Sequence, residues 1–119
     1  MNTGKITTHA LDLRLAKPAE GLQVELWRVE DESRRRLSTA ILNADGRADE
    51  PLLAGGVMLQ GNYELQFQIG SYYMDKADEA VDMTPFQTVV IRFRVLDESQ
   101  HYHIPLLIAP GGYSTYRGS

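Results

Sequence analysis

The sequence predicts an all-β protein, an antiparallel β-sandwich formed by a single domain over residues 1–119. Apolar and polar residues alternate with the two-residue period of a half-buried strand in at least six segments. Residues that favour turns, mainly Gly, Pro, Asn and Asp, separate these segments. Short strands at this spacing are typical of a sandwich or barrel. No internal repeat or linker composition indicates a second domain.

The predicted strands follow one another along the whole chain. In chain order they cover residues 6–13, 22–27, 36–42, 62–69, 88–96 and 101–108. The alternation is clearest in 62–69, where four aromatic or aliphatic residues share one face and Glu and Gln occupy the other. Weaker candidates at 57–60 and 113–116 bring the count to eight. Turns are expected at 17–18, 43–46, 55–56, 61–62 and 110–112.

One short helix is expected near residues 75–83. Ala77, Ala80 and Val81 fall at helical spacing, and acidic residues open the segment, where they favour a helix N-terminus. Pro85 ends the pattern, so the helix would have two turns at most.

A run of charged residues, Glu30–Arg36, lies between two predicted strands. Its three consecutive arginines could bind a polyanion. The interpretation we favour is a solvated hairpin loop in which the neighbouring acidic residues offset the arginines.

Composition excludes several classes of function. The chain has no cysteine, so disulfides, thiol nucleophiles and cysteine-ligated metals are ruled out. Its net charge of −4 gives no general attraction to nucleic acid. No apolar run approaches the roughly 20 residues of a membrane helix, and the first residues lack the apolar core of a signal peptide. We therefore expect a cytoplasmic protein without nucleic-acid or membrane partners.

Only three histidines are present, which makes their positions informative. His9 lies in the first predicted strand. His101 and His103 lie two residues apart in another, so both should face the same side of a sheet. Neutral imidazole is the usual general base near neutral pH. Two alternatives remain, namely surface histidines with no chemical role and a three-histidine zinc site.

Arginine and hydroxyl groups add to these candidates. Arg47 follows the turn residues 43–46, whose glycine can take a positive φ, so its side chain could leave the turn in a defined direction. A guanidinium suits a carboxylate or a developing oxyanion, although an arginine after a turn is usually only a surface residue. At the C-terminal end, alternation puts Ser114 and Tyr116 on one face of a predicted edge strand.

Four segments together resemble the 5-hydroxyisourate hydrolases, transthyretin-related enzymes of urate breakdown. In order they are Thr7–Asp12, Asp45–Arg47, His101–Leu107 and Tyr113–Ser119. The resemblance spans the whole chain, and the terminal Tyr-Arg-Gly-Ser is its most specific part. It implies a transthyretin-like sandwich of two four-stranded sheets, and a homotetramer with active sites at the dimer–dimer interface.

The resemblance also implies a reaction and its residues. The reaction is hydrolytic opening of 5-hydroxyisourate to 2-oxo-4-hydroxy-4-carboxy-5-ureidoimidazoline, with neither metal nor organic cofactor. His9, Arg47 and His103 match the catalytic positions, while Tyr116, Ser119 and, more weakly, His101 match positions that contact substrate; Ser114 is added from its place beside Tyr116. Either His9 or His103 would activate water, and Arg47 would stabilise the oxyanion.

Two other functions fit the same strands. A transthyretin-like carrier would bind an aromatic ligand in the same channel, but such a site favours apolar lining over His and Tyr. A β-sandwich adhesion or carbohydrate-binding module explains the strands and leaves the histidines, arginine and tyrosine without a role.

Overall fold

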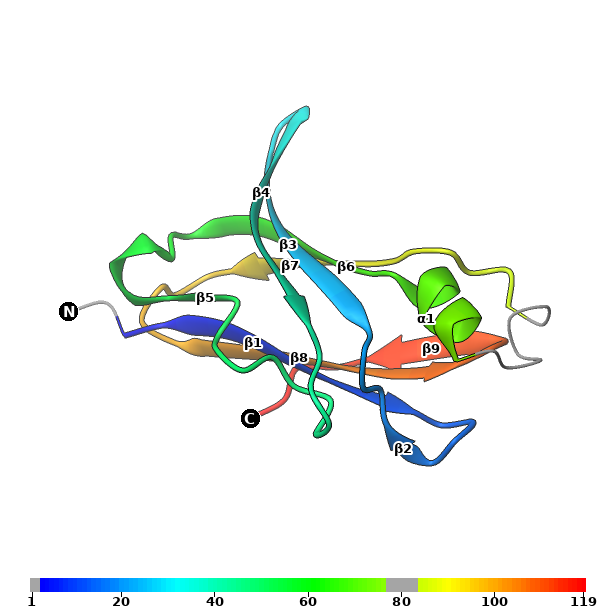
Figure 1. Ribbon diagram of the computed structural model, residues 1–119. Coiled ribbons are helices and arrows are strands. Elements are labelled where there is room, and N and C mark those ends of the chain that lie inside the picture. The colour runs from blue at the N-terminus through cyan, green and yellow to red at the C-terminus, as the bar shows by residue number, and fades with distance from the viewer. Residues whose placement is uncertain (1–2, 77–83) are drawn as a thin grey trace.

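A computed structural model describes residues 3–76 and 84–119, and it has two β-sheets packed face to face (Figure 1). The elements in chain order are β1 (Lys5–Asp12), β2 (Lys17–Pro18), β3 (Gln23–Glu30), β4 (Ser33–Ile41), β5 (Leu53–Ala54), a 3₁₀ turn (Gly55–Val57), β6 (Gly61–Phe67), α1 (Ile69–Asp75), β7 (Val89–Val95), β8 (His101–Ala109) and β9 (Gly112–Thr115). The predicted sandwich is confirmed. All six stronger strand predictions, and the weaker one at 113–116, match observed strands to within a few residues.

The first sheet is built around β1 and β8. Its order is β2-β1-β8-β9, with β2 at the end of β1, and β5 pairs with the beginning of β1. This sheet thus has five strands, one more than the family resemblance implies. β1 and β8 run parallel, whereas the other described pairs in both sheets are antiparallel, so the sandwich is not wholly antiparallel as predicted. The parallel register places Thr7 opposite His103 and Lys5 opposite His101. Strands from the two ends of the sequence therefore lie side by side.

The second sheet has the order β4-β3-β6-β7 and is entirely antiparallel. β3 and β4 are joined by a two-residue turn, in which Asp31 has a φ of 47°. A left-handed residue suits the twist of a tight hairpin, and Asp tolerates it better than most residues. The tip of this hairpin projects beyond the sandwich (Figure 1).

The core lies between the two sheets and follows the alternation read from the sequence. In β6 the inward residues Tyr63, Leu65 and Phe67 are at most 1% exposed. In β8 Tyr102 and Ile104 face inward, as predicted, so His101 and His103 face the outer side. Each large side chain buried in this way contributes roughly 1.5–3 kcal/mol to folding.

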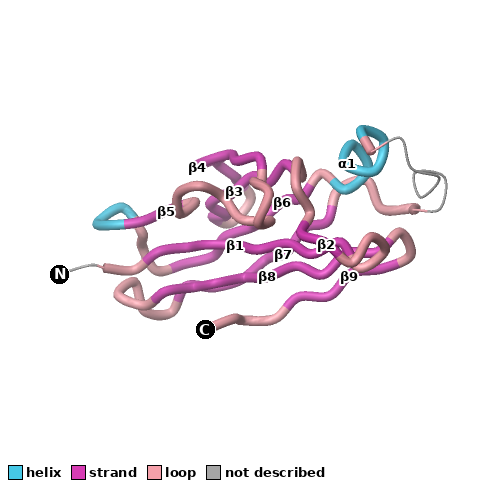
Figure 2. The backbone as a smooth tube through the Cα atoms, turned by 60° about the horizontal axis from the view of Figure 1, so that its bottom comes forward, coloured by secondary structure: helices cyan, strands magenta, loops and turns pink. Residues whose placement is uncertain are grey.

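A buried carboxylate attaches the helix to the first sheet. Asp12, at the end of β1, is fully buried and accepts a hydrogen bond from the Tyr72 hydroxyl of α1 at 2.8 Å. The backbone amides of Arg14 and Leu15 donate to its other oxygen at 3.0 and 3.3 Å. These partners compensate for burying the group. α1 is thereby held at one end of the sandwich, opposite the 3₁₀ turn (Figure 2).

Two predicted elements differ from the structure. The short helix that the structure describes, α1, ends at Asp75, where the predicted helix begins, and residues 77–83 of that prediction lie outside the described residues. Tyr72 and Tyr73 pack this helix into the core, a tertiary contact that local spacing does not reveal. The segment 57–60, predicted as a strand, contains the end of the 3₁₀ turn and no strand.

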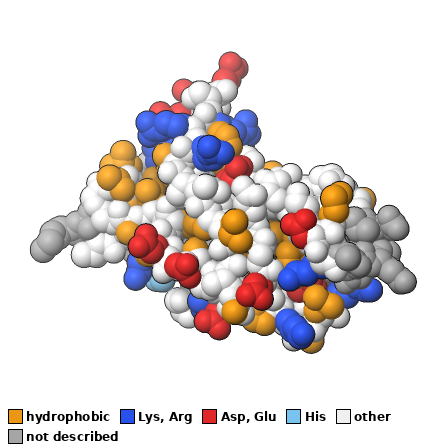
Figure 3. Space-filling model, viewed as in Figure 1, with side chains coloured by type: hydrophobic (Ala, Val, Ile, Leu, Met, Phe, Trp, Pro, Cys, Tyr) orange, Lys and Arg blue, Asp and Glu red, His pale blue; other side chains and the backbone are white. Residues whose placement is uncertain are grey.

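The charged run Glu30–Arg36 is not a loop, because only Asp31 and Glu32 form the turn. Arg34 belongs to β4, and its guanidinium donates two hydrogen bonds of 3.1 Å to Glu64 of β6. Arg92 of β7 donates to the same carboxylate at 2.8 Å. Lys and Arg side chains gather around the base of the projecting hairpin (Figure 3). These partners lower the pKa of Glu64 to about 2, even though burial opposes the shift.

Replacing Glu64 with Gln should lower the stability of the fold in a pH-dependent way. Its folded pKa is about 2 against an ordinary value of 4.5, so the carboxylate stabilises the fold above pH 5, and this contribution is lost as the pH falls toward 2. Because both arginines are about half exposed, we expect Glu64→Gln to lower the free energy of unfolding by about 1–2 kcal/mol at pH 7.

Chemical denaturation of Glu64→Gln and the unmodified chain, at one protein concentration from pH 7 to pH 2.5, would measure this difference. Glu25→Gln is the matched control. Glu25 pairs with a single arginine, Arg36, which is mainly exposed, so its loss should change the stability less. A stability difference that is equal at both ends of the pH range would contradict the prediction.

Candidate active site

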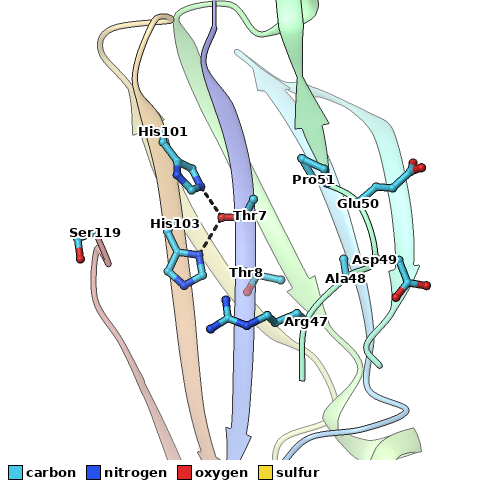
Figure 4. Close-up of a pocket in the computed structure, with 10 residues that line it drawn as sticks. All are labelled: Thr7, Thr8, Arg47, Ala48, Asp49, Glu50, Pro51, His101, His103 and Ser119. Carbon is cyan, nitrogen blue, oxygen red and sulfur yellow. Dashed lines mark hydrogen bonds between the residues drawn. The ribbon is translucent and has the colours of Figure 1, made fainter. Parts of the chain in front are cut away.

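A hollow of about 310 Å³ opens on the outer face of the first sheet, where β1 and β8 lie side by side (Figure 4). β1, β8, the segment after β4 and the C-terminal segment all contribute to it. Its lining residues are Thr7, Thr8, Arg47, Ala48, Asp49, Glu50, Pro51, His101, His103 and Ser119. The hollow therefore combines imidazole, guanidinium and hydroxyl groups from four separate parts of the chain.

Thr7 connects the two histidines of β8. Its hydroxyl oxygen lies 2.6 Å from His101 Nε2 and 2.8 Å from His103 Nδ1, and the two ring centres are 6.0 Å apart. His103 is half-buried and His101 is exposed. The parallel register explains this arrangement, since it puts Thr7 opposite His103 and the alternation then turns all three side chains to one face.

The turn after β4 holds Arg47 against β1. The Asn43 side-chain oxygen accepts from the amides of Asp45 and Arg47 at 2.9 and 3.2 Å, and Gly46 has the predicted positive φ, 76°. A Cβ on Gly46 would lie 2.5 Å from the carbonyl oxygen of Ala10, so only glycine allows the turn to lie this close to the strand. The backbone of Arg47 forms an isolated antiparallel β-bridge with His9 of β1, and its guanidinium reaches across the strand toward His103 (Figure 4).

The C-terminal segment closes the opposite side of the hollow. The amide of Gly118 donates to the carbonyl oxygen of His103 at 2.7 Å. A Cβ on Gly118 would lie 2.5 Å from His103 Cδ2, so the imidazole packs directly over this glycine. Arg117 donates to the His101 carbonyl oxygen at 3.2 Å and lies over the Tyr102 ring. These contacts bring Ser119 to the edge of the hollow.

Burial and neighbouring cations favour the neutral form of both histidines of β8. Partial burial lowers the pKa of His103, and the positive charges of Arg47, His101 and His9 lower it further. Partial burial also lowers the pKa of His101, together with Lys5 and Arg117. Asp49 and Glu50 could oppose these cations, but their carboxylates point away from the imidazoles (Figure 4). At neutral pH the rings can therefore accept protons.

The structure brings together four of the seven predicted site residues. Arg47, His101, His103 and Ser119 line the hollow. His9 lies on the same face of β1 as Thr7 and is paired with Arg47, but it does not line the hollow. Ser114 lies opposite Leu107, four residues or roughly 13 Å along β8 from His103. Tyr116 is 59% exposed and is not among the lining residues.

Sequence reasoning missed Thr7 as part of the site. Its place two residues before His9 in one predicted strand was the available signal, since it puts both side chains on one face. Its neighbour Thr8 faces the core, where its hydroxyl donates to the Ile104 carbonyl oxygen at 2.7 Å. Asp49, Glu50 and their neighbours carried no sequence signal, because their position depends on the path of the chain after the turn.

The site chemistry follows from the groups assembled in the hollow. A neutral imidazole beside a guanidinium can remove a proton from water while the cation stabilises negative charge on an attacked carbonyl. Among residues 3–76 and 84–119, no group of three or more His, Asp or Glu side chains is arranged to hold a metal ion. In the same part of the chain, no helix has the length and apolar character needed to cross a bilayer.

Comparison with known proteins gives a consistent result. Residues 6–118 match the family model described as the HIUase/Transthyretin family. A protein of Halalkalibacterium halodurans named 5-hydroxyisourate hydrolase is 50% identical over 119 residues, which cover 98% of this chain and 99% of that protein. The solved 5-hydroxyisourate hydrolase of Klebsiella pneumoniae is 34% identical with a TM-score of 0.81, covering 98% of this chain and 99% of that one.

Two further solved structures share the fold. An (S)-allantoin synthase superposes with a TM-score of 0.90 at 35% identity, and the match covers 98% of this chain but only 44% of the synthase. Sea bream transthyretin, solved with thyroxine, superposes with a TM-score of 0.83 at 20% identity over 96% of this chain and 94% of that one. At that identity the likeness concerns the fold alone.

The pKa of His103 should depend on Arg47 and not on Lys5. Arg47→Gln removes a positive charge that lowers the pKa of His103, so this pKa should rise toward its ordinary value of 6.5. Lys5→Gln is the matched control, since the charge of Lys5 lowers the pKa of His101. NMR titration of the assigned imidazole signals would measure both pKa values. An unchanged His103 pKa in Arg47→Gln would contradict the influence of the Arg47 charge on this imidazole.

Proposed function

Because the chain belongs to the HIUase/Transthyretin family, we propose that it is a hydrolase that opens the ring of 5-hydroxyisourate to give 2-oxo-4-hydroxy-4-carboxy-5-ureidoimidazoline. The strongest support is that curated relatives of this name share 40–50% identity with nearly the full chain. The hollow on β1 and β8 supplies groups suited to such chemistry, and it supports hydrolysis better than it supports the carrier interpretation.

The proposed reaction begins with water bound beside His103. The imidazole removes a proton from this water as its oxygen attacks the ring carbonyl, and Arg47 stabilises the resulting oxyanion. The carbon–nitrogen bond then breaks, and the leaving nitrogen takes the proton held by the imidazole. The carbonyl carbon becomes a carboxylic acid, which loses its proton to the solvent and leaves a carboxylate. One water is consumed, and the scheme uses side chains of this chain alone.

We assign the general base to His103 rather than His9. His103 lines the hollow and His9 does not. Burial and Arg47 lower the pKa of His103, which favours a neutral ring at physiological pH. His9 lies beside Arg47 on the same face, where its role would be to support the guanidinium and to share in proton transfer. Ser119, at the edge of the hollow, would contact the substrate ring.

Replacing His103 with Ala should lower turnover of 5-hydroxyisourate by about a hundredfold or more, the usual contribution of a general base. The assay follows the ultraviolet decay of freshly generated substrate, with a blank without protein because the substrate also decays spontaneously. Arg35→Gln is the control variant, since Arg35 is an exposed residue of the other sheet.

Nearly full activity in a folded His103→Ala variant would rule out the assignment of the base. Absence of activity in the unmodified, folded chain would contradict the hydrolase proposal itself. A screen of aromatic ligands would then test the carrier interpretation.

We also propose that the protein is a homotetramer with the hollow at the dimer–dimer interface. The hollow lies open on the outer face of the first sheet, and Tyr116, three residues before Ser119, is mainly exposed, so both are available to a second copy of the chain. Light scattering should give four times the chain mass of 13.4 kDa. A monomer would contradict this assembly. The cytoplasmic location expected from the sequence stays a prediction.

A further inference from the structure

The hydroxyl group of Thr7 makes two hydrogen bonds to imidazoles, and its single proton restricts how it can do so. The oxygen lies 2.6 Å from His101 Nε2 and 2.8 Å from His103 Nδ1, both within hydrogen-bond distance. A hydroxyl donates one hydrogen bond and accepts others. If Thr7 donates to one ring, the other ring must donate an N–H to the Thr7 oxygen. The two histidines are therefore coupled through one atom.

Two arrangements place the Thr7 proton between the neutral rings, and a third, in which both rings donate to the Thr7 oxygen, also has His103 protonated on Nδ1. In the first, His103 carries its proton on Nδ1 and donates to Thr7, while Thr7 donates to His101 Nε2. The free lone pair of His103 is then on Nε2, where it can take a proton from water. In the second, Thr7 donates to His103 Nδ1 and accepts a hydrogen bond from the Nε2–H of His101. His103 then carries its proton on Nε2 and cannot act as a base.

Arg47 favours the first arrangement. The second nitrogen of the His103 ring, Nε2, lies on the side of the ring away from Thr7, and the Arg47 guanidinium lies near that side (Figure 4). Arginine offers only donors and a positive charge, so it attracts a lone pair at Nε2 and opposes an N–H there. The positive charge of Arg47 is also the largest charge effect on His103. Gly118 packs closely under the ring on its Cδ2 side.

We infer that Thr7 is a positioning residue, which holds His103 in the tautomer with a proton on Nδ1 and a free lone pair on Nε2. In this arrangement His101 Nε2 accepts the hydrogen bond that the Thr7 hydroxyl donates. This role differs from the substrate contact expected from the sequence. Thr7 itself need not touch the substrate. The kinetic part of this inference rests on the proposed function, whereas the tautomer can be measured without substrate.

Other charged groups around the rings must be considered before a pH dependence is interpreted. They come from β1, from the turn after β4 with the segment that follows it, and from the C-terminal segment, and they are Lys5, His9, Arg47, Asp49, Glu50 and Arg117. The test therefore changes Thr7 alone and leaves every charge in place. Thr7→Val keeps the shape of the side chain and removes the hydroxyl, and Thr7→Ser keeps the hydroxyl.

The first measurement is the tautomer of His103 by ¹⁵N NMR in the protein without substrate. The unmodified chain and Thr7→Ser should show His103 protonated on Nδ1, whereas Thr7→Val should show a mixture or the Nε2-protonated form. Finding His103 protonated on Nε2 in the unmodified chain would overturn the inference. So would an unchanged tautomer in Thr7→Val. Both results are independent of whether the protein hydrolyses 5-hydroxyisourate.

The second measurement is the rate of 5-hydroxyisourate hydrolysis against pH. Thr7→Val should lower kcat about ten- to a hundredfold, the range found for partners that orient metal-binding histidines, with little change in KM. The acid limb of its pH profile should shift with the altered imidazole, and Thr7→Ser should restore both kcat and the profile. A Thr7→Ser variant as impaired as Thr7→Val would indicate a packing role and overturn the inference.

Discussion

The parallel pairing of β1 with β8 is the constraint on which the rest of the structure depends. Parallel neighbours require a long connection, and here the whole second sheet and α1 lie between the two strands in the chain. The pairing puts Thr7 opposite His103 and turns Lys5, Thr7 and His9 to the same face as the histidines of β8. A shift of one residue in the β1 register would turn Lys5, Thr7 and His9 toward the core.

Two glycines hold the remaining parts of the site against this strand pair. Gly46 lets the turn that carries Arg47 lie directly on β1, and Gly118 lets the C-terminal segment lie under the His103 ring. A side chain at either position would overlap atoms of the neighbouring strand. The hollow is therefore built from backbone contacts at its two sides, which position Arg47 and Ser119 more firmly than long flexible side chains alone could do.

The two sheets carry different electrostatic arrangements. On the second sheet, Arg34 and Arg92 satisfy the nearly buried Glu64, which stays ionised to about pH 2. On the first sheet, cations lie around His103, and none of the ion pairs among the described residues involves it. The positive charge of neighbouring arginines thus stabilises the Glu64 carboxylate on one sheet and favours the uncharged form of His103 on the other. Of the two sheets, only the first has a neutral imidazole that can act as a base at neutral pH.

The sequence by itself determined the strands, their inward faces and the chemical types at the site. Alternation is a local property, so residues such as Tyr63 and Tyr102 could be assigned to the core, and Arg47 could be placed after a glycine turn. The tertiary structure decided which strands are neighbours and which way they run. It also decided that the helix uses Tyr72 and Tyr73, and that Thr7 joins His101 to His103. These depend on contacts between residues about 60 to 96 positions apart, and no local period encodes them.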